Sequence, residues 1–174
     1  IEWHLAHGVD QFFIYDNEST DDTKDILEPY IKQGIVDYEP WPGYRMQLAA
    51  YDDCLEQHRF DARWIAFIDL DEFIVPVQDA TIPDFLKRFE AFPAVEINWL
   101  VYGSGGNKEK SDEDVMKRFR FHSLPDHYLN RHVKSIVNPR RVFTMIGCHE
   151  VARINGKAAD SHGNIIKNNF RERT

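Results

Sequence analysis

The stretch WIAFIDLDEFIVP, residues 64–76, places an acidic cluster between two apolar runs. The cluster consists of Asp69, Asp71 and Glu72, three carboxylates within four residues. Carboxylates at this spacing repel one another, and each loses hydration if the apolar residues before it form a buried strand. We therefore expect a positive charge to compensate the cluster, and we expect the strand that precedes it to belong to the core.

Strand and helix patterns alternate along the chain on both sides of this cluster. Short apolar runs between turn residues predict strands, and apolar residues at helical spacing predict helices. The expected strands are residues 11–16, 35–38, 64–69, 94–103, 116–121, 134–137 and 141–146, and the expected helices are residues 1–8, 17–34, 45–58 and 81–92. This alternation predicts an α/β domain with a mainly parallel sheet that helices cover on both faces. Ligands of such sheets bind at the carboxyl ends of strands, where Asp16 and Asp69 lie.

Capping patterns mark the ends of two of these helices. Ser19 and Thr20 are the expected N-terminal caps of the helix in residues 17–34, and Gly34 is its expected end. Thr81 and Asp84 have the spacing of a capping box at the start of the last helix.

The composition excludes several classes of protein and partner. An apolar fraction of 43% within 174 residues supports one folded domain. The formal charge of -8 argues against nucleic acid as a partner. Cys54 and Cys148 lie far apart without a CxxC spacing, so neither a disulfide framework nor a thiolate zinc site is indicated.

The sequence shows no targeting or membrane segment. No apolar run approaches the roughly 18 residues that cross a bilayer, and no signal peptide is visible. The chain starts at Ile1 inside an expected helix, so we interpret it as a fragment of a longer protein. Segments of the longer protein outside this fragment could associate with a membrane.

Asp69 and Asp71 are the candidate metal ligands. In an extended segment, residues two apart project to the same side, so these two would face one cation while Leu70 and Glu72 point away. Carboxylate oxygens suit Mn²⁺ or Mg²⁺, which keep waters and accept substrate phosphates as further ligands. The missing positive charge would then be a metal ion with a diphosphate. The alternative is a solvated strand end, because an isolated Asp-x-Asp pair occurs by chance in many proteins.

Several stretches resemble a known family. YDNESTDDT, residues 15–23, resembles a turn of family 2-type glycosyltransferases with the GT-A fold, and WIAFIDLDEFIVP resembles the Asp-x-Asp region of the related glycosyltransferase family 92. The segments IEWHLAHGVDQFFIYDNES, QLAAYDDCL, INWLVYGSGG and KSIVNP fit the same family in the same order. The resemblance covers residues 1 to about 149, which is most of the chain.

The resemblance implies a GT-A, Rossmann-like fold and a sugar-transfer reaction. The donor would be a nucleotide-sugar, expected to be a UDP-sugar, and the acceptor a hydroxyl of a glycan or another molecule. Inversion at the anomeric carbon and a Mn²⁺ or Mg²⁺ cofactor are implied in the same way. The implied location is the cytoplasm or the cytoplasmic membrane face in a bacterium, and the Golgi lumen in a eukaryote.

The resemblance also implies roles for individual residues. Asp16 and Asn17 would bind the donor, with Asp16 contacting the uracil or ribose. Asp71 would ligate the metal directly, while Asp69 would contact the ribose or a metal-bound water. His149 lies where many GT-A enzymes have a late histidine that completes the metal site.

A domain boundary follows from where the resemblance fails. The family's first strand, which ends in an Asn-Glu pair, is absent, so residues 1–154 would form a GT-A-like domain that lacks its N-terminal strand. Residues 155–174 match poorly and form an unassigned tail.

Five further residues are candidates for contact with the donor. Arg45 and Gln47 precede an expected helix and could bind the diphosphate or sugar, although a solvated helix start fits the sequence equally well. The basic residues Lys134, Arg140 and Arg141 could neutralise phosphate, but a lone basic cluster is weak evidence.

The general base has three candidates. Glu96 shares one strand face with Asn98 and could orient the sugar or act as the base, with exposure at a sheet edge as the favoured alternative. Asp112 and Asp114 follow a glycine-rich loop, and a solvated charge cluster is the alternative for both.

Two other functions fit parts of the sequence. FIDLDEFIV, residues 67–75, also resembles the first motif of haloacid-dehalogenase-type phosphatases, in which the first aspartate is the nucleophile. Phe73 departs from that motif, and an ordered α/β pattern precedes it, which counts against this reading. The other alternative is a catalytically inactive module that binds a sugar or a protein.

Overall fold

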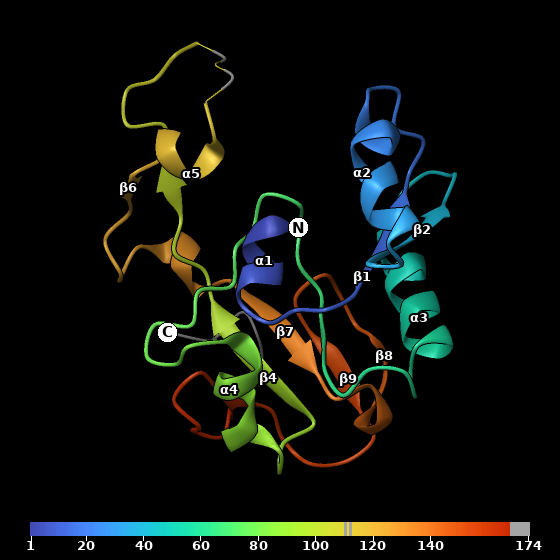
Figure 1. Cartoon of the computed structure of the whole chain (residues 1–174). Coiled ribbons are helices and arrows are strands. Elements are labelled where there is room, and N and C mark those ends of the chain that lie inside the picture. Colours follow the sequence, from blue (N-terminus) through green and yellow to red (C-terminus); the bar gives the residue numbers. More distant parts are fainter. Residues whose placement is uncertain (110, 112, 168–174) are drawn as a thin grey trace.

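A computed structural model describes residues 1–109, 111 and 113–167 as a mixed α/β structure (Figure 1). Its helices are α1 (Glu2–Ala6), α2 (Thr23–Lys32), α3 (Gln47–Gln57), α4 (Ile82–Leu86) and α5 (Val115–Arg118), with 3₁₀ turns η1 (Lys87–Phe89), η2 (Tyr128–Arg131) and η3 (Pro139–Arg141). Its strands are β1 (Phe12–Asp16), β2 (Val36–Pro40), β3 (Ile65–Ala66), β4 (Ala94–Asn98), β5 (Tyr102–Gly103), β6 (Phe121–His122), β7 (Val133–Val137), β8 (Val142–Met145), β9 (Val151–Arg153) and β10 (Ala159–Asp160). Within this part of the chain, no helix combines the length and the apolar character that crossing a bilayer would need.

The described strands form four small sheets instead of the one mainly parallel sheet that we expected. The largest has the order β10-β4-β7-β3, in which only the β10–β4 pair is parallel. The β1–β2 pair is also parallel, while β5–β6 and β8–β9 are antiparallel. The chain type is therefore α/β as predicted, but the strand directions are mixed.

The path of the chain explains why β7 runs antiparallel to β4. After β4 the chain makes an excursion through β5, α5 and β6, and then returns to the point that it left. The Trp99 amide donates a hydrogen bond to the carbonyl oxygen of His132, which joins the two ends of the excursion at 2.9 Å. A strand that starts where its neighbour ended must run back beside it, so β7 pairs with β4 in the antiparallel direction.

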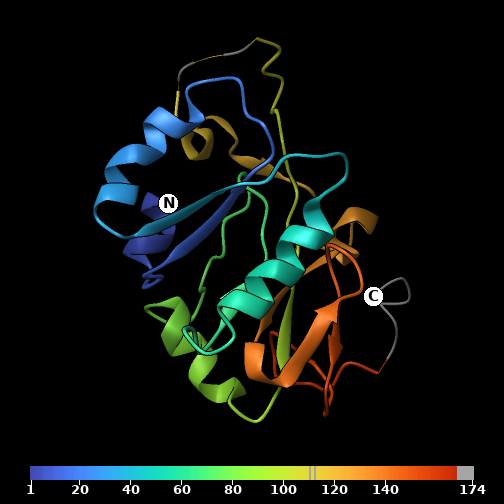
Figure 2. The same ribbon diagram turned by 90° about the vertical axis from the view of Figure 1, so that its right-hand side faces the viewer.

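The core lies on both faces of the four-stranded sheet. On one face, Leu55 of α3 packs in a cluster with Val142 and Val151 from the β8–β9 pair, and all three are fully buried. Figure 2 shows α3 crossing this side of the molecule. On the other face, Leu86 of α4 and Phe89 of η1 pack against the sheet. Burial of each such side chain stabilises the fold by about 1.5–3 kcal/mol. Helices therefore pack on both faces of the four-stranded sheet, as predicted.

The start of α2 differs from the prediction, whereas the start of α4 agrees with it. Asp22, not Ser19 or Thr20, is the N-cap residue of α2. Ser19 stays in the preceding loop because its amide donates a hydrogen bond to the Asp16 carboxylate at 2.9 Å. At α4, the Thr81 hydroxyl accepts a hydrogen bond from the amide three residues later at 3.2 Å, which confirms the capping interaction.

Two expected strands are interrupted. Residues 94–103 divide into β4 and β5, because the Val101 amide bonds to the Asn130 side chain at 2.9 Å and not to a strand partner. Residues 116–121 form most of the short helix α5 and the start of β6. In α5, the Lys117 ammonium lies 2.6 Å from the Asp114 carboxylate one turn away, a local contact that favours the helical conformation.

The segment that the sequence left unassigned takes part in the largest sheet. Ala159 pairs with Val95 and Asp160 with Glu96, in the parallel direction. Ala158 and Ala159 are both buried. Residues 158–160 therefore belong to the same packed unit as β4.

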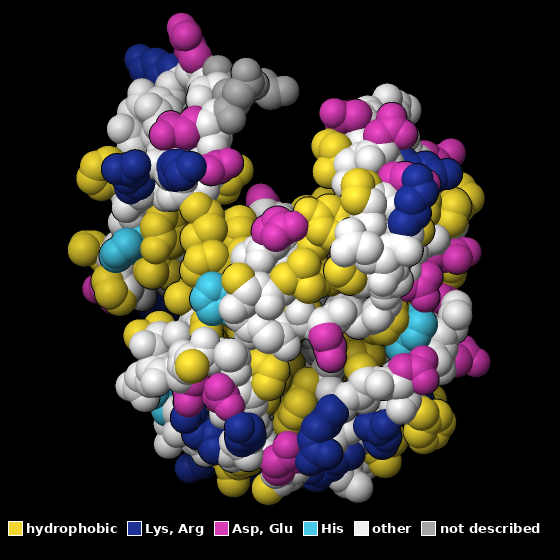
Figure 3. All heavy atoms as spheres, viewed as in Figure 1, with side chains coloured by type: hydrophobic (Ala, Val, Ile, Leu, Met, Phe, Trp, Pro, Cys, Tyr) yellow, Lys and Arg dark blue, Asp and Glu magenta, His cyan; other side chains and the backbone are white. Residues whose placement is uncertain are grey.

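A hollow separates two parts of the molecule. β5, α5 and β6 form an arm on one side, and α2 with the β1–β2 pair stands on the other (Figure 1). Figure 3 shows the hollow between them in the space-filling view, with acidic side chains at its floor. This arrangement leaves the connection between β3 and α4, which carries the acidic cluster, facing the space between the two parts.

His4 of α1 anchors this connection. The Ile74 amide donates a hydrogen bond to His4 Nε2 at 3.1 Å, so the accepting nitrogen must be unprotonated. Trp3 Nε1 donates to the carbonyl oxygen of the same Ile74 at 3.0 Å. His4 is buried, and burial lowers its pKa to about 4.

The stability of the protein should fall between pH 6.5 and pH 4 because of His4. The imidazole of the unfolded chain takes up a proton near pH 6.5, whereas that of the folded protein does so only near pH 4. The stabilisation is therefore present above pH 6.5 and is lost as the pH falls to 4. Thermal melts at several pH values should show a flatter dependence for His4→Gln, while His162→Gln, at an exposed position, should keep the wild-type slope. An unchanged slope in His4→Gln would contradict this role.

Candidate functional site

The acidic cluster forms a tight turn and not an extended segment. The Glu72 amide donates a hydrogen bond to the carbonyl oxygen of Asp69 at 3.1 Å. The Asp69 amide donates in return to the Glu72 carboxylate at 2.8 Å. Leu70 and Asp71 occupy the exposed tip of the turn. The expectation that Glu72 points away from Asp69 is therefore wrong, because it assumed extended backbone.

The positive charge that compensates the cluster comes from the chain itself. Lys134 Nζ lies 2.9 Å from Asp69 Oδ2 and 3.3 Å from Glu72 Oε2. Its side chain is only 3% exposed, whereas that of Asp69 is 45% exposed. Burial opposes the charged ammonium, but the hydrogen bond to Asp69 and the charges of Glu72 and Asp69 outweigh it, so the pKa of Lys134 is raised. Lys134 thus compensates part of the negative charge of the cluster, at Asp69 and Glu72.

The Asp71 carboxylate remains available to a cation. Asp71 is exposed, and it forms no hydrogen bond or ion pair with any residue that the structure describes. Asp69 keeps almost half of its side chain exposed beside it. Carboxylate oxygens suit Mn²⁺ or Mg²⁺, which take their other ligands from water and phosphate. The residues present therefore fit such a cation.

His149 is held elsewhere in the site. His149 Nδ1 lies 2.8 Å from the carbonyl oxygen of Val133, and its ring packs beside Trp99 and His132 at centroid distances of 5.4 and 5.5 Å. In the described ranges, no three His, Cys, Asp or Glu residues lie close enough together to hold a metal ion. The structure therefore does not assemble a three-residue site from Asp69, Asp71 and His149.

Gln47, a predicted donor-binding residue, contacts the acidic turn. Gln47 Nε2 lies 3.4 Å from Asp69 Oδ1 and donates a hydrogen bond to the Tyr51 hydroxyl at 3.0 Å. Both residues belong to α3, which brings the start of this helix to the turn. Arg45 is exposed, and its guanidinium lies over the ring of Tyr44 at 5.0 Å.

Asp16 and Asn17 organise the loops after β1 and β2. The Asp16 carboxylate accepts hydrogen bonds from the Ser19 amide and the Tyr38 hydroxyl. Hydrogen bonding to the side chains of Ser19 and Tyr38, and to the Ser19 amide, lowers the pKa of Asp16. Asn17 Nδ2 donates hydrogen bonds to the carbonyl oxygens of Trp41 and Gly43 at 2.7 and 2.9 Å. Both residues therefore shape the carboxyl end of the β1–β2 pair.

The three base candidates have different environments. Glu96 is only 1% exposed, and its carboxylate lies 3.9 Å from the guanidinium of Arg153, so the expected position at a sheet edge is wrong. Asp114 is exposed, and the hydrogen bond from Lys117 lowers its pKa, which makes it a weak base. Asp112 lies outside the described residues.

The pairing of Lys134 with the acidic turn and the position of Trp99 were not predicted from the sequence. Lys134 lies in the apolar segment VKSIV, and a lysine within a buried strand normally has a charged partner, so the signal was present. Trp99 packs its ring 6.0 Å from the Lys134 ammonium and stacks on His132 at 5.0 Å. No local pattern identified Trp99, because its partners are distant in the sequence.

Comparisons with known proteins agree with the resemblance seen in the sequence. The family Glycosyltransferase family 92 matches residues 1–172. A glycosyltransferase family 92 protein of Oryza sativa subsp. japonica is 31% identical over 99 residues, which cover 54% of this chain and 17% of the rice protein. A galactan beta-1,4-galactosyltransferase of Arabidopsis thaliana is 26% identical over 151 residues, which cover 79% of this chain and 29% of that protein.

The chain corresponds to a small part of these relatives. A second glycosyltransferase family 92 protein, from Ricinus communis, is 37% identical over 91 residues, which cover 50% of this chain and 16% of that protein. The chain thus spans less than a fifth of the length of the rice and Ricinus proteins that it matches.

Removing the Lys134 ammonium should destabilise the fold through the carboxylates that it leaves behind. We expect Lys134→Met to lower the free energy of unfolding by about 2–3 kcal/mol, and Glu72→Gln in the same chain to restore part of it. Urea denaturation of the two single variants and the double variant gives the coupling energy, which should be roughly 1 kcal/mol or more.

The exposed pair Lys87–Asp84 is the matched control for this cycle. Its atoms are 2.6 Å apart, but both side chains are largely open to solvent, so its coupling energy should be much smaller. Additive effects of the Lys134 and Glu72 substitutions would contradict the compensating role of Lys134.

Proposed function

Since the chain belongs to glycosyltransferase family 92, we propose that it is the donor- and metal-binding part of a metal-dependent glycosyltransferase. The donor is a nucleotide-sugar, the acceptor is a hydroxyl of a glycan, and the anomeric carbon is inverted. The observation that carries the proposal is the Asp71 carboxylate, exposed without a described partner at the tip of a turn that Lys134 holds in place.

Lys134 pairs with two of the three carboxylates, which gives the three different roles in the proposed site. Because its ammonium pairs with Asp69 and Glu72, these two can remain ionised side by side despite their mutual repulsion. Asp71 is left to project from the tip of the turn. We assign Asp71 as the direct metal ligand, and Asp69, whose side chain is almost half exposed, as the residue that contacts the ribose or a metal-bound water.

The remaining donor contacts come from the surrounding loops. Gln47 reaches Asp69 from α3 and so borders the diphosphate position. Asp16 and Asn17 at the end of β1 are assigned to the nucleoside, which we take to be uridine, and Arg45 to the diphosphate or sugar. A bound Mn²⁺ or Mg²⁺ would supply Lewis-acid stabilisation of the departing nucleoside diphosphate.

The similarity to a galactan beta-1,4-galactosyltransferase of Arabidopsis thaliana suggests which sugars to test first. We would test galactose as the donor sugar and β-1,4-linked galactose as the acceptor. Glu96 is too deeply buried to reach an acceptor without movement, and the lowered pKa of Asp114 disfavours it as a base. The third base candidate, Asp112, lies outside the described residues.

We also propose that the fold is of the GT-A type. The parallel β1–β2 and β10–β4 pairs support this, together with the position of Asp16 at the carboxyl end of a parallel strand.

UDP should stabilise the protein in the presence of Mn²⁺, and Asp71→Asn should abolish most of that effect. A ligand that binds only the folded state at a hundredfold excess over its Kd adds about 2.7 kcal/mol, which a thermal melt detects readily. Without ligand, Asp71→Asn should be as stable as the wild type or slightly more stable, because one member of a repelling cluster is neutralised.

Asp10→Asn removes a charge at another exposed aspartate and should keep the full effect of UDP with Mn²⁺. If UDP produced an equal shift in EDTA, the metal–diphosphate site would be wrong. If Asp71→Asn retained the full Mn²⁺-dependent shift, Asp71 would not be a ligand.

A further inference from the structure

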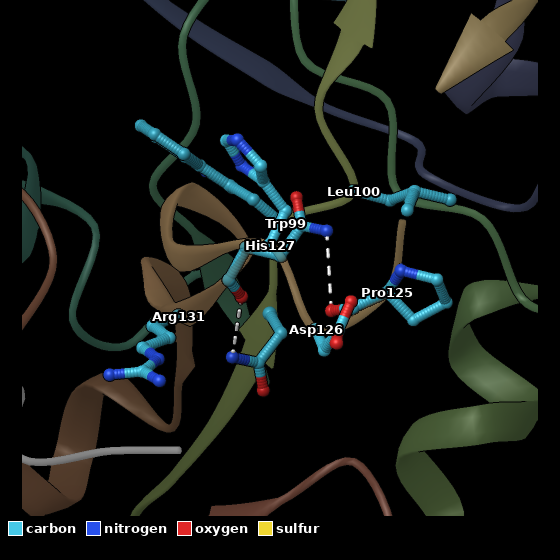
Figure 4. Close-up of a pocket in the computed structure, with 8 residues that line it drawn as sticks. Trp99, Leu100, Pro125, Asp126, His127 and Arg131 are labelled. Atoms are coloured by element: carbon cyan, nitrogen blue, oxygen red, sulfur yellow. Dashed lines mark hydrogen bonds between the residues drawn. The ribbon is translucent and has the colours of Figure 1, made fainter. Parts of the chain in front are cut away.

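A pocket of about 420 Å³ opens where the chain leaves β4 (Figure 4). Residues 98–100 form one part of its lining, and residues from the segment 125–131 form the rest. Figure 4 shows Leu100 and Pro125 on one side and Arg131 on the other. The volume is within the range of small-ligand sites, roughly 300–1,000 Å³.

The walls of this pocket are held in place by one buried amide. Asn130 is only 5% exposed, and its Nδ2 donates hydrogen bonds to the carbonyl oxygens of Leu124 and Pro125 at 2.9 and 3.3 Å. Its Oδ1 accepts from the Val101 amide at 2.9 Å, and its own carbonyl oxygen accepts from the Asn98 side chain at 2.9 Å. Both sides of the pocket are therefore tied to the same residue, which makes the pocket a formed feature of the fold.

Two charged side chains that line the pocket have no partner among the described residues. Asp126 and Arg131 form no hydrogen bond or ion pair with a described residue, and both are exposed. Together they offer acceptor oxygens and donor nitrogens of opposite charge. Leu100, Pro125 and the indole of Trp99 supply apolar surface beside them.

This combination selects one class of ligand. A phosphate would meet the Asp126 carboxylate, and a purely apolar ligand would desolvate Asp126 and Arg131 without replacing their hydrogen bonds. A neutral sugar unit has hydroxyls that donate to a carboxylate and accept from a guanidinium, and its ring carbons present an apolar face to an indole. We propose that this pocket binds a neutral sugar unit of the glycan acceptor.

The pocket borders the donor site through Trp99. The Trp99 ring, which lines the pocket, lies 6.0 Å from the Lys134 ammonium, and that ammonium bonds to Asp69 at 2.9 Å. An acceptor bound here would be separated from the acidic turn by one tryptophan and one lysine. The inference rests on the proposed function for calling the ligand an acceptor, but the binding itself is independent of metal and donor.

The test measures the binding of β-1,4-galactotetraose to the 174-residue chain by calorimetry or ligand-observed NMR. The double variant Asp126→Asn/Arg131→Gln changes only exposed side chains, so it should melt at the wild-type temperature. Losing two charge-assisted hydrogen bonds should raise its Kd at least about tenfold. Asp10→Asn/Lys157→Gln, which removes the same charges at exposed positions elsewhere, should leave the Kd unchanged.

Equal binding by the pocket variant and the wild type would overturn the proposal. So would an absence of wild-type binding to β-1,4-galactotetraose, cellotetraose and xylotetraose, each measured with UDP and Mn²⁺ present. The Mn²⁺-dependent UDP shift, measured on the same samples, separates this failure from failure of the proposed function. A UDP shift without oligosaccharide binding rejects only the pocket, and pocket-dependent binding without a UDP shift rejects only the donor site.

Discussion

The pairing of Lys134 with Asp69 and Glu72 is the constraint on which the site depends. A buried ammonium without a partner would cost several kcal/mol, and adjacent carboxylates without a cation would repel each other. Their contacts at 2.9 and 3.3 Å satisfy both requirements at once. The pair also joins β7 to the turn after β3, so the direction of β7 and the position of the acidic turn are fixed together.

Other contacts position the same turn from different parts of the chain. Gln47 reaches Asp69 from α3, and His4 of α1 accepts the hydrogen bond of Ile74 just after the cluster. Trp99, at the end of β4, packs against Lys134 and lines the pocket. Elements far apart in the sequence therefore converge on the turn formed by residues 69–72. The turn can expose Asp71 because Asp69 and Glu72 pair with Lys134.

The sequence predicted element types well where a local pattern decides them. Thr81 caps α4, Gly34 follows α2, and the order of most strands and helices agrees with the structure. Local patterns failed where a distant side chain competes with them. Val101 bonds to Asn130 and so ends the strand that its apolar neighbours predicted. Ser19 bonds to Asp16 and so stays outside α2.

The sequence by itself determined the acidic cluster, the types of its flanking elements and the family to which the chain belongs. Only the tertiary structure decided that the compensating cation is Lys134, 65 residues from Asp69, and that Gln47 joins the cluster while His149 bonds to Val133. It also decided the antiparallel direction of β7. The physical reason is that turns and periodicity depend on neighbouring residues. Charge pairing and strand direction depend on which distant segments of the chain the fold brings together.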